Sequence, residues 1–235
     1  EVVGPKWHSI FWENFEMAMA ARSDDVLFGP GYSLPLLLKR PRKRVVATHS
    51  IYEDADWRYR MTYAKRDEYS ARTANAVIVP CDSTGDQVAK HYGIPHKRLF
   101  SVPQGAPPAF CPLENPVLAC QTRIELLGTN VPYILFVGKL SARRNIRNLI
   151  AGFAKAKREK GLPHKLLLFG PNHVDLPLAD ICREHRVADD VVQTPGKVNR
   201  HEDLIRIYNA ADVFVQPSRY EGWSITTVEA LACGI

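Results

Sequence analysis

Short apolar runs alternate with helical stretches along almost the whole chain, and this alternation restricts the fold more than any other feature. Most runs lack a regular apolar–polar pattern, which is typical of strands covered on both faces. The expected strands are residues 26–28, 45–48, 76–79, 99–102, 133–137, 165–169, 191–192 and 213–215. The expected helices are residues 57–73, 83–91, 146–157, 178–185, 202–209 and a last one from about 224. Strands and helices in succession predict parallel, doubly wound α/β sheets.

A stretch rich in Pro and Gly interrupts the alternation between residues 103 and 132. Five Pro or Gly fall within residues 105–116, which is typical of a linker. The sequence therefore predicts two Rossmann-like domains, residues 1–115 and 116–235, that face each other across a cleft. We expect both to be incomplete, the first without its start and the second without its end, because the chain opens within an element and stops directly after Gly234.

The composition is that of an ordinary globular protein, with 46% hydrophobic and 24% charged residues. No apolar run approaches the roughly 18 residues that span a bilayer, and the N-terminus lacks a signal-peptide pattern. The five cysteines are scattered without a C-x2-C pair, so the sequence indicates neither a disulfide framework nor a zinc site. These features predict a cytoplasmic location.

The net charge of +6 favours an anionic partner, and the densest basic run is residues 39–44. This run lies between an apolar segment and an expected strand, which favours a solvated loop. Contact with anionic lipid is the alternative, and it would place the protein at the inner face of the membrane. Interleaved aromatic residues are lacking, so no nucleic-acid partner is expected.

Two carboxylates flank the start of the last expected helix. Glu221 lies in the turn after the expected strand 213–215, and Glu229 follows eight positions later in the helix that begins near Ser224. The first backbone N–H groups and the positive dipole end of such a helix form an anion site. Carboxylates beside it suit a ligand with phosphates and hydroxyls, such as a nucleotide sugar. For Glu229, a capping box with Thr226 is the alternative.

The string Pro-Ser-Arg-Tyr-Glu-Gly-Trp-Ser-Ile-Thr-Thr-Val-Glu-Ala-Leu-Ala-Cys-Gly at residues 217–234 resembles the E-x7-E signature of glycosyltransferase family 4. These are retaining glycosyltransferases of the GT-B fold, and the resemblance runs from about residue 25 to the end. It implies that Glu221 contacts the transferred sugar and supports its developing positive charge. Glu229 could accept hydrogen bonds from both ribose hydroxyls. Ser224 stands where the family usually has Gly.

A second group of candidates follows the strand 133–137. Gly138 allows a close turn, and Lys139 and Arg144 place two cations at the carboxyl end of a parallel strand, where phosphate binds. The family usually shows Gly-Arg-x-x-x-x-Lys-Gly here, and its two cations grip the donor diphosphate. In this chain Lys139 stands where the family has Arg, and Arg144 stands where it has Lys. Asn145 replaces the second Gly.

Positive groups aimed at the departing diphosphate would stabilise the charge that builds on it as the glycosidic bond breaks. Besides Lys139 and Arg144, the helix N-terminus at Ser224 and Ile225 would contribute. With these groups in place we expect no metal and no other cofactor. The D-x-D string at residues 54–56 is consistent with chance and is expected to be an exposed acidic loop.

His49 ends the expected strand 45–48 in the first domain, again at a carboxyl end. The string Val-Val-Ala-Thr-His resembles the family's strand that ends in His-Asp, with Ser50 in place of Asp. The resemblance implies a catalytic role for His49 near the sugar or the acceptor. Gln104-Gly105 replaces the family's Asn-Gly and is expected to belong to the interdomain hinge.

The sequence thus predicts a retaining, metal-independent glycosyltransferase. It would move a sugar, with mannose-like sugars favoured by the stretch 25–38, from a nucleotide-diphosphate donor to a hydroxyl. A saccharide or lipid-linked acceptor in glycan or lipopolysaccharide-type assembly is expected. The alternative is a nucleotide-sugar-binding protein of the same fold without turnover.

Overall fold

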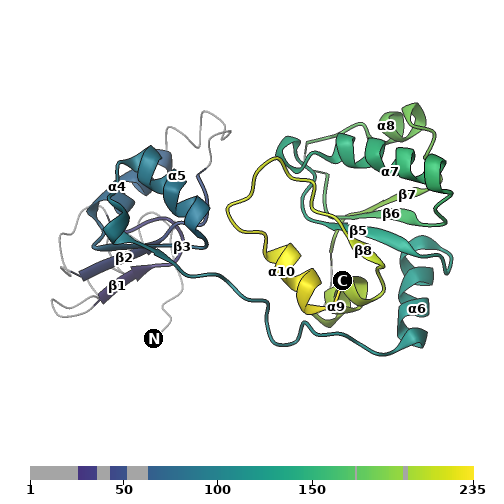
Figure 1. Cartoon of the computed structure of the whole chain (residues 1–235), viewed down its shortest axis with the longest axis horizontal. Helices are drawn as coiled ribbons and strands as arrows, with labels where there is room; N and C mark the ends of the chain where they lie inside the picture. The colour runs from purple at the N-terminus through teal and green to yellow at the C-terminus, as the bar shows by residue number, and fades with distance from the viewer. Residues whose placement is uncertain (1–25, 36–42, 52–62, 173, 198–200) are drawn as a thin grey trace, which may run out of the picture. The chain divides into compact units, whose positions relative to one another are not determined.

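The computed structural model describes residues 26–35, 43–51, 63–172, 174–197 and 201–235. The chain divides into two compact units, Glu1–Gln104 and Gly105–Ile235, and each contains a parallel sheet with helices packed on it (Figure 1). This confirms the predicted α/β fold with parallel sheets. No helix within these ranges is long and apolar enough to cross a membrane.

The first unit contains a four-stranded parallel sheet in the order β1-β2-β3-β4. Its strands are β1 (Val26–Gly29), β2 (Lys43–Ala47), β3 (Ala76–Val79) and β4 (Leu99–Ser101). Helices α4 (Lys65–Thr73) and α5 (Asp82–Tyr92) pack on one face of the sheet (Figure 1). The core between them contains buried side chains such as Val46, Val77 and Val88.

Part of the basic run is strand rather than loop. Lys43 and Arg44 belong to β2, where they pair with Val26 and Leu27 of β1, and the Arg44 N–H donates to Asn75 Oδ1 at 2.8 Å. Because of its pairing with β1, β2 begins two residues earlier than the strand 45–48 that the apolar pattern predicts. The other residues of the run, the D-x-D string at 54–56 and the start of the helix expected from 57 lie outside the described residues.

The second unit contains a parallel sheet in the order β7-β6-β5-β8. Its strands are β5 (Tyr133–Val137), β6 (Lys165–Phe169), β7 (Val191–Thr194) and β8 (Val213–Phe214). The chain runs outward from β5 to β7 and then returns to the other side of β5. The loops after β5 and β8 consequently both start at a topological switch point, where open α/β sheets bind ligands.

Helices cover both faces of this sheet in two layers (Figure 1). Side chains of α7 (Ile146–Lys160) and α8 (Leu178–Glu184) form one apolar cluster with alternate residues of β5 and β6, including Phe136. The other alternate residues, including Leu135, pack in a second cluster with α9 (His201–Asn209) and with Ala230 of α10 (Ile225–Ala232). Burial on both faces explains why these strands are continuous apolar runs.

A helix, α6 (Pro116–Leu127), occupies much of the stretch that the sequence predicts as a linker. Asn115 caps it by accepting from the Leu118 N–H at 3.0 Å, and Pro116 is its first residue, where a missing N–H does no harm. Gly128 ends it with a φ of 72°. The density of Pro, which indicated a linker, here marks a helix start.

The carboxyl ends of β5, β6 and β7 approach one another through glycines. A Cβ added to Gly170 would lie 1.9 Å from the carbonyl oxygen of Gly138, and one added to Gly196 would lie 2.6 Å from the Cα of Gly170. The Gly138 N–H donates to the Phe169 carbonyl at 3.0 Å, which extends the ladder beyond the strand. Any side chain at Gly170 would therefore separate the strand ends that carry the loops.

We expect Gly170→Ala to lower the free energy of unfolding by about 3 kcal/mol, because the new methyl group meets rigid backbone atoms. Urea denaturation of the two proteins measures this difference. Gly152→Ala on α7 is the control, since a Cβ there meets nothing within 4 Å and alanine favours helix. Equal midpoints for the Gly170 variant and the unmodified chain would contradict the close packing.

Candidate functional site

Two loops meet at the switch point of the second unit. One follows β5 and contains the short 3₁₀ helix η4 (Ala142–Arg144), and the other is the turn between β8 and α10. The Arg219 N–H donates to the Arg143 carbonyl at 3.0 Å, and Asn145 Nδ2 donates to the Pro217 carbonyl at 3.2 Å. The candidate residues of both loops are thus held beside each other by hydrogen bonds to backbone carbonyls.

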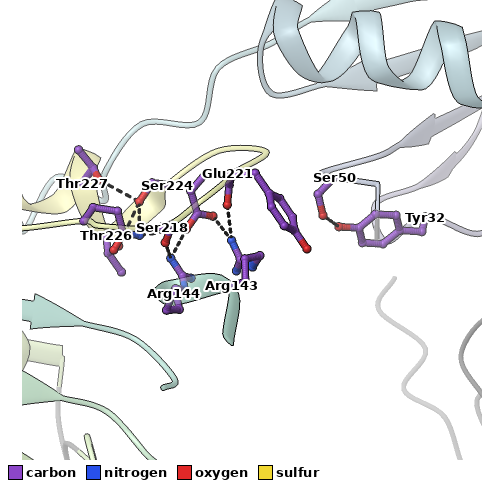
Figure 2. Close-up of polar contacts among 11 residues, drawn as sticks. Tyr32, Ser50, Arg143, Arg144, Ser218, Glu221, Ser224, Thr226 and Thr227 are labelled. Atoms are coloured by element: carbon purple, nitrogen blue, oxygen red, sulfur yellow. Dashed lines mark hydrogen bonds and ion pairs between the residues drawn. The ribbon is translucent and has the colours of Figure 1, made fainter. Parts of the chain in front are cut away.

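Glu221 is paired with two arginines (Figure 2). Arg144 Nη1 donates to Glu221 Oε1 and also to Ser218 Oγ at 3.3 Å. Arg143 Nη1 lies 2.6 Å from Glu221 Oε2 and donates to the Tyr220 carbonyl at 2.9 Å. The structure therefore places the carboxylate expected to contact the sugar directly against a cation expected to grip the diphosphate.

Burial lowers the pKa of the Arg144 guanidinium from its ordinary value, while the carboxylate of Glu221 opposes this effect and Arg143 adds to it. An arginine nevertheless stays charged in a protein. The cluster of two guanidinium groups and one carboxylate thus has an excess of one positive charge, which suits an anionic ligand.

Gln216 connects Glu221 to the start of α10. Its Nε2 donates to Glu221 Oε1 at 3.1 Å and to Ser224 Oγ at 2.9 Å. Ser224 is the N-cap residue of α10, yet its hydroxyl makes no cap bond and instead accepts from Thr227 Oγ1 at 2.8 Å (Figure 2). Ser224 and Ile225 therefore stand at the positive end of the α10 dipole. The side chain of Gln216 connects Ser224 to Glu221.

Glu229 lies within α10 and is buried, with 8% of its surface exposed. The Tyr208 hydroxyl donates to its Oε2 at 2.8 Å. The alternative of a capping box with Thr226 is wrong, because the helix begins at Ile225 with Ser224 as its N-cap residue. A capping box requires the acidic residue three positions after the N-cap, and Glu229 follows Ser224 by five.

Gly138 and Lys139 follow β5 directly. Gly138 has a φ of 143°, and a Cβ there would lie 3.8 Å from the Arg144 guanidinium carbon, so Gly138 and Arg144 are neighbours. Lys139 is exposed, and no ion pair within the described ranges includes it. Its ammonium group is therefore available to an anion in solution.

Asn145 has a φ of 57°, in the left-handed region, where Gly and Asn are the residues most readily accommodated. It is the residue between η4 and α7, so the chain turns there to start the helix. Asn is thus a residue that tolerates a conformation that Gly adopts freely. It also adds the bond to Pro217, which Gly could not make.

His49 lies in the first unit, at the carboxyl end of β2. Its Nε2 is 3.0 Å from the Pro30 carbonyl oxygen, and because a carbonyl only accepts, Nε2 carries the proton. In the tautomer with its single proton on Nε2, Nδ1 is an acceptor. The Tyr32 ring lies edge-on to the His49 ring, with 5.5 Å between their centroids. The Tyr32 hydroxyl also forms a hydrogen bond with Ser50 Oγ at 3.2 Å (Figure 2). These contacts orient His49 without the Asp of the family pattern.

A cavity of about 340 Å³ adjoins His49 at the carboxyl edge of the first sheet. Apolar side chains, including Phe28, Ile78 and Val102, form much of its wall, and His49 and Gln104 are its hydrogen-bonding side chains. Few polar groups in an apolar cavity are typical of a small-molecule site. Gln104, which the sequence places only in a hinge, thus lines this cavity.

Three residues of the site were not predicted from the sequence: Arg143, Gln216 and Tyr208. Arg143 directly precedes the predicted cation Arg144, so its charge and its position in the same loop could have identified it. Gln216 and Tyr208 sit on an expected strand end and an expected helix, and nothing in their local pattern separates them from packing residues. Their partners lie 5 and 21 positions away.

We expect Asn145→Val to lower the free energy of unfolding by about 2 kcal/mol, because a β-branched side chain strongly disfavours positive φ. Asn145→Gly should stay within about 1 kcal/mol of the unmodified chain, since Gly adopts this conformation freely. Urea denaturation measures both. A larger loss from the Gly variant than from the Val variant would show that the bond to Pro217 outweighs the backbone conformation.

Two family models match the chain, one over most of each unit. Residues 5–110 match Glycosyltransferase Family 4, and residues 121–235 match Glycosyl transferases group 1.

Among curated proteins, the chain is similar to O-antigen chain mannosyltransferase B of Escherichia coli, with 25% identity over 93% of this chain and 57% of the relative. Among solved structures it is similar to WaaG, a glycosyltransferase involved in lipopolysaccharide biosynthesis. The TM-score is 0.65, the sequence identity is 19%, and the match covers 89% of this chain and 57% of WaaG. The chain is also similar to the structure of Anabaena HepE in complex with UDP and glucose. The TM-score is 0.68, the sequence identity is 17%, and the match covers 82% of this chain and 51% of HepE. The chain spans little more than half of each.

Proposed function

This chain belongs to glycosyltransferase family 4 and has the GT-B fold, and on that premise we propose that it transfers a sugar from a nucleotide-diphosphate donor to a hydroxyl group with retention of configuration. The observation that carries the proposal is the cluster of Glu221, Arg143 and Arg144 at the switch point beside the N-terminus of α10. In this cluster the two arginines that would bind an anion are in direct contact with the carboxylate that would face the sugar.

In this proposal the donor diphosphate binds Arg144, Lys139 and the α10 terminus at Ser224 and Ile225. As the glycosidic bond breaks, negative charge builds on the departing phosphate, and these fixed positive groups stabilise it. Because they supply the positive charge themselves, the proposed reaction uses no metal ion. Glu229 accepts from the ribose hydroxyls at the other side of the nucleotide.

Glu221 and the diphosphate would compete for the same guanidinium groups. Phosphate oxygens match the arginine fork as well as a carboxylate does, so donor binding would take Arg143 and Arg144 from Glu221. The released carboxylate would then contact a sugar hydroxyl and support the oxocarbenium-like charge. Retention would follow from attack on the face that the phosphate leaves, with the phosphate taking the acceptor proton.

We place the acceptor in the first unit, at the cavity beside His49. His49 offers an acceptor at Nδ1, and the apolar wall suits the hydrophobic face of a sugar ring. A saccharide or lipid-linked acceptor fits the relatives, which include a mannosyltransferase of O-antigen chains and a glycosyltransferase of lipopolysaccharide biosynthesis. The mannosyltransferase of O-antigen chains favours a mannose-like donor sugar, and a lipid-linked acceptor would require work at the inner membrane face.

A protein that binds nucleotide sugars without turnover is the second candidate. The pairing of Glu221 with two arginines favours it, because a carboxylate that stays paired cannot assist a reaction. Whether bound diphosphate releases Glu221 decides between the two.

We expect this chain to bind one of UDP, GDP and ADP more tightly than the other two, equally with and without magnesium, because arginine and lysine groups supply the positive charge. Calorimetric titration measures this and identifies the donor base. A requirement for magnesium would overturn the metal-independent mechanism, and no binding by any of the three would count against the family's activity in this chain.

We expect Arg144→Ala to weaken diphosphate binding about tenfold, through loss of charge-assisted hydrogen bonds. Arg147→Ala is the matched control, since Arg147 pairs at 3.5 Å with Glu184 on the exposed side of α7 and α8. The same titration measures both. Similar losses in the two variants would mean that general charge, and not the Arg144 site, attracts the nucleotide.

We expect Glu221→Ala to lower the rate of sugar transfer by about a thousandfold, because a preorganised charge at the reacting sugar is lost. Diphosphate affinity should stay equal or rise, since Arg143 and Arg144 lose their internal competitor. Transfer assays and calorimetry measure the two effects. A fall in affinity equal to the fall in rate would contradict the separate roles of Glu221 and Arg144.

A further inference from the structure

A buried tyrosine supports the carboxylate of Glu229. Tyr208 on α9 is fully buried, with 0% of its surface exposed, and its hydroxyl donates to Glu229 Oε2 at 2.8 Å. Glu229 is itself 8% exposed, so its charge is largely removed from water. A buried carboxylate requires hydrogen-bond donors, and Tyr208 provides one from the core.

The ring of Tyr208 has little freedom to move. Phe110 and Phe214 each place a ring 5.9 Å from it, and all three belong to the apolar cluster below the sheet. The hydroxyl therefore stands at a fixed point of the core. Since it binds one oxygen of the carboxylate, it fixes the direction in which the Glu229 side chain extends from α10.

We propose that Tyr208 is a positioning residue that sets the carboxylate of Glu229 for the ribose hydroxyls of the nucleotide. The inference rests on the proposed function, in which Glu229 binds the ribose. Tyr208 would not touch the nucleotide. It would hold one carboxylate oxygen so that the group meets the ribose in a single orientation, which lowers the ordering required on binding.

The Tyr208 hydroxyl keeps its proton at neutral pH. Burial raises the pKa of the Tyr208 hydroxyl far above its ordinary value, and the charge of Glu229 adds to that effect. The hydroxyl therefore keeps its proton and remains a donor to the carboxylate.

A second tyrosine of the same core provides the matched control. Tyr133 is also fully buried, and its hydroxyl donates to the Ile207 carbonyl at 2.5 Å. Removing that hydroxyl deletes a buried hydrogen bond to α9, next to Tyr208, without touching Glu229. A purely structural role for tyrosine hydroxyls in this core would make the two variants behave alike.

The test compares each of UDP, GDP and ADP with its 2′,3′-dideoxy form in calorimetric titrations of this chain, and measures the ratio of the two affinities. We expect Tyr208→Phe to lower this ratio about tenfold while the affinity for the dideoxy form stays unchanged, as expected for one charge-assisted hydrogen bond. Tyr133→Phe should keep the ratio of the unmodified chain. Glu229→Gln should lose it.

The outcomes distinguish a failure of the positioning role of Tyr208 from a failure of the proposed ribose contact of Glu229. If Glu229→Gln loses the ratio but Tyr208→Phe keeps it, the positioning role is overturned and the ribose contact stands. If both tyrosine variants lose the ratio equally, loosening of the core explains the effect and the inference falls. If the unmodified chain binds no diphosphate, or does not distinguish ribose from dideoxyribose, the proposed role of Glu229 fails first.

A measurement on the unmodified chain covers the case in which Tyr208→Phe does not fold. Carbon-13 at Cζ of the tyrosines reports on the hydrogen bond of each hydroxyl. We expect the Tyr208 signal to shift on addition of the ribonucleoside diphosphate and to stay in place with the dideoxy form. An equal response to both would overturn the proposal.

Discussion

The contact between the backbone of Gly138 and that of Gly170 is the constraint on which the second unit depends. No side chain fits between these strand ends, so β5 and β6 stay paired up to the residues where their loops depart. The loop after β5 leaves this edge in a fixed direction and meets the turn after β8. Arg143, Arg144 and Glu221 are neighbours for that reason, although 77 positions separate Arg144 from Glu221.

The carboxylate of Glu221 at this edge offsets part of the charge of two guanidinium groups and leaves an excess of positive charge that attracts anions. Two guanidinium groups side by side repel each other, and the carboxylate of Glu221 offsets that repulsion. Glu221 thus occupies the position that the proposed phosphate would take. Lys139 remains outside this balance, so the site keeps positive charge toward solvent.

The sequence predicts much of the fold because its signals are local. The apolar runs at β3, β5 and β6 give those strands with their observed bounds, since burial on both faces makes the pattern continuous. The helix α6 was missed because Pro116 indicates both a linker and a helix start, and only Asn115 distinguishes them. Tyr208 was missed because its partner lies on another helix, and such contacts depend on the packing of the whole unit.

The return of the chain from β7 to the far side of β5 also determines when the site can exist during folding. Contacts across more than seventy positions form only after a long segment has closed on itself, which is entropically slow. Among the described strands of this sheet, β8 comes last along the chain, and the turn that contains Glu221 follows it. The pairing of β5, β6 and β7 can therefore form before the site appears, so ligand recognition requires the two loops to have joined and is absent from earlier folding intermediates.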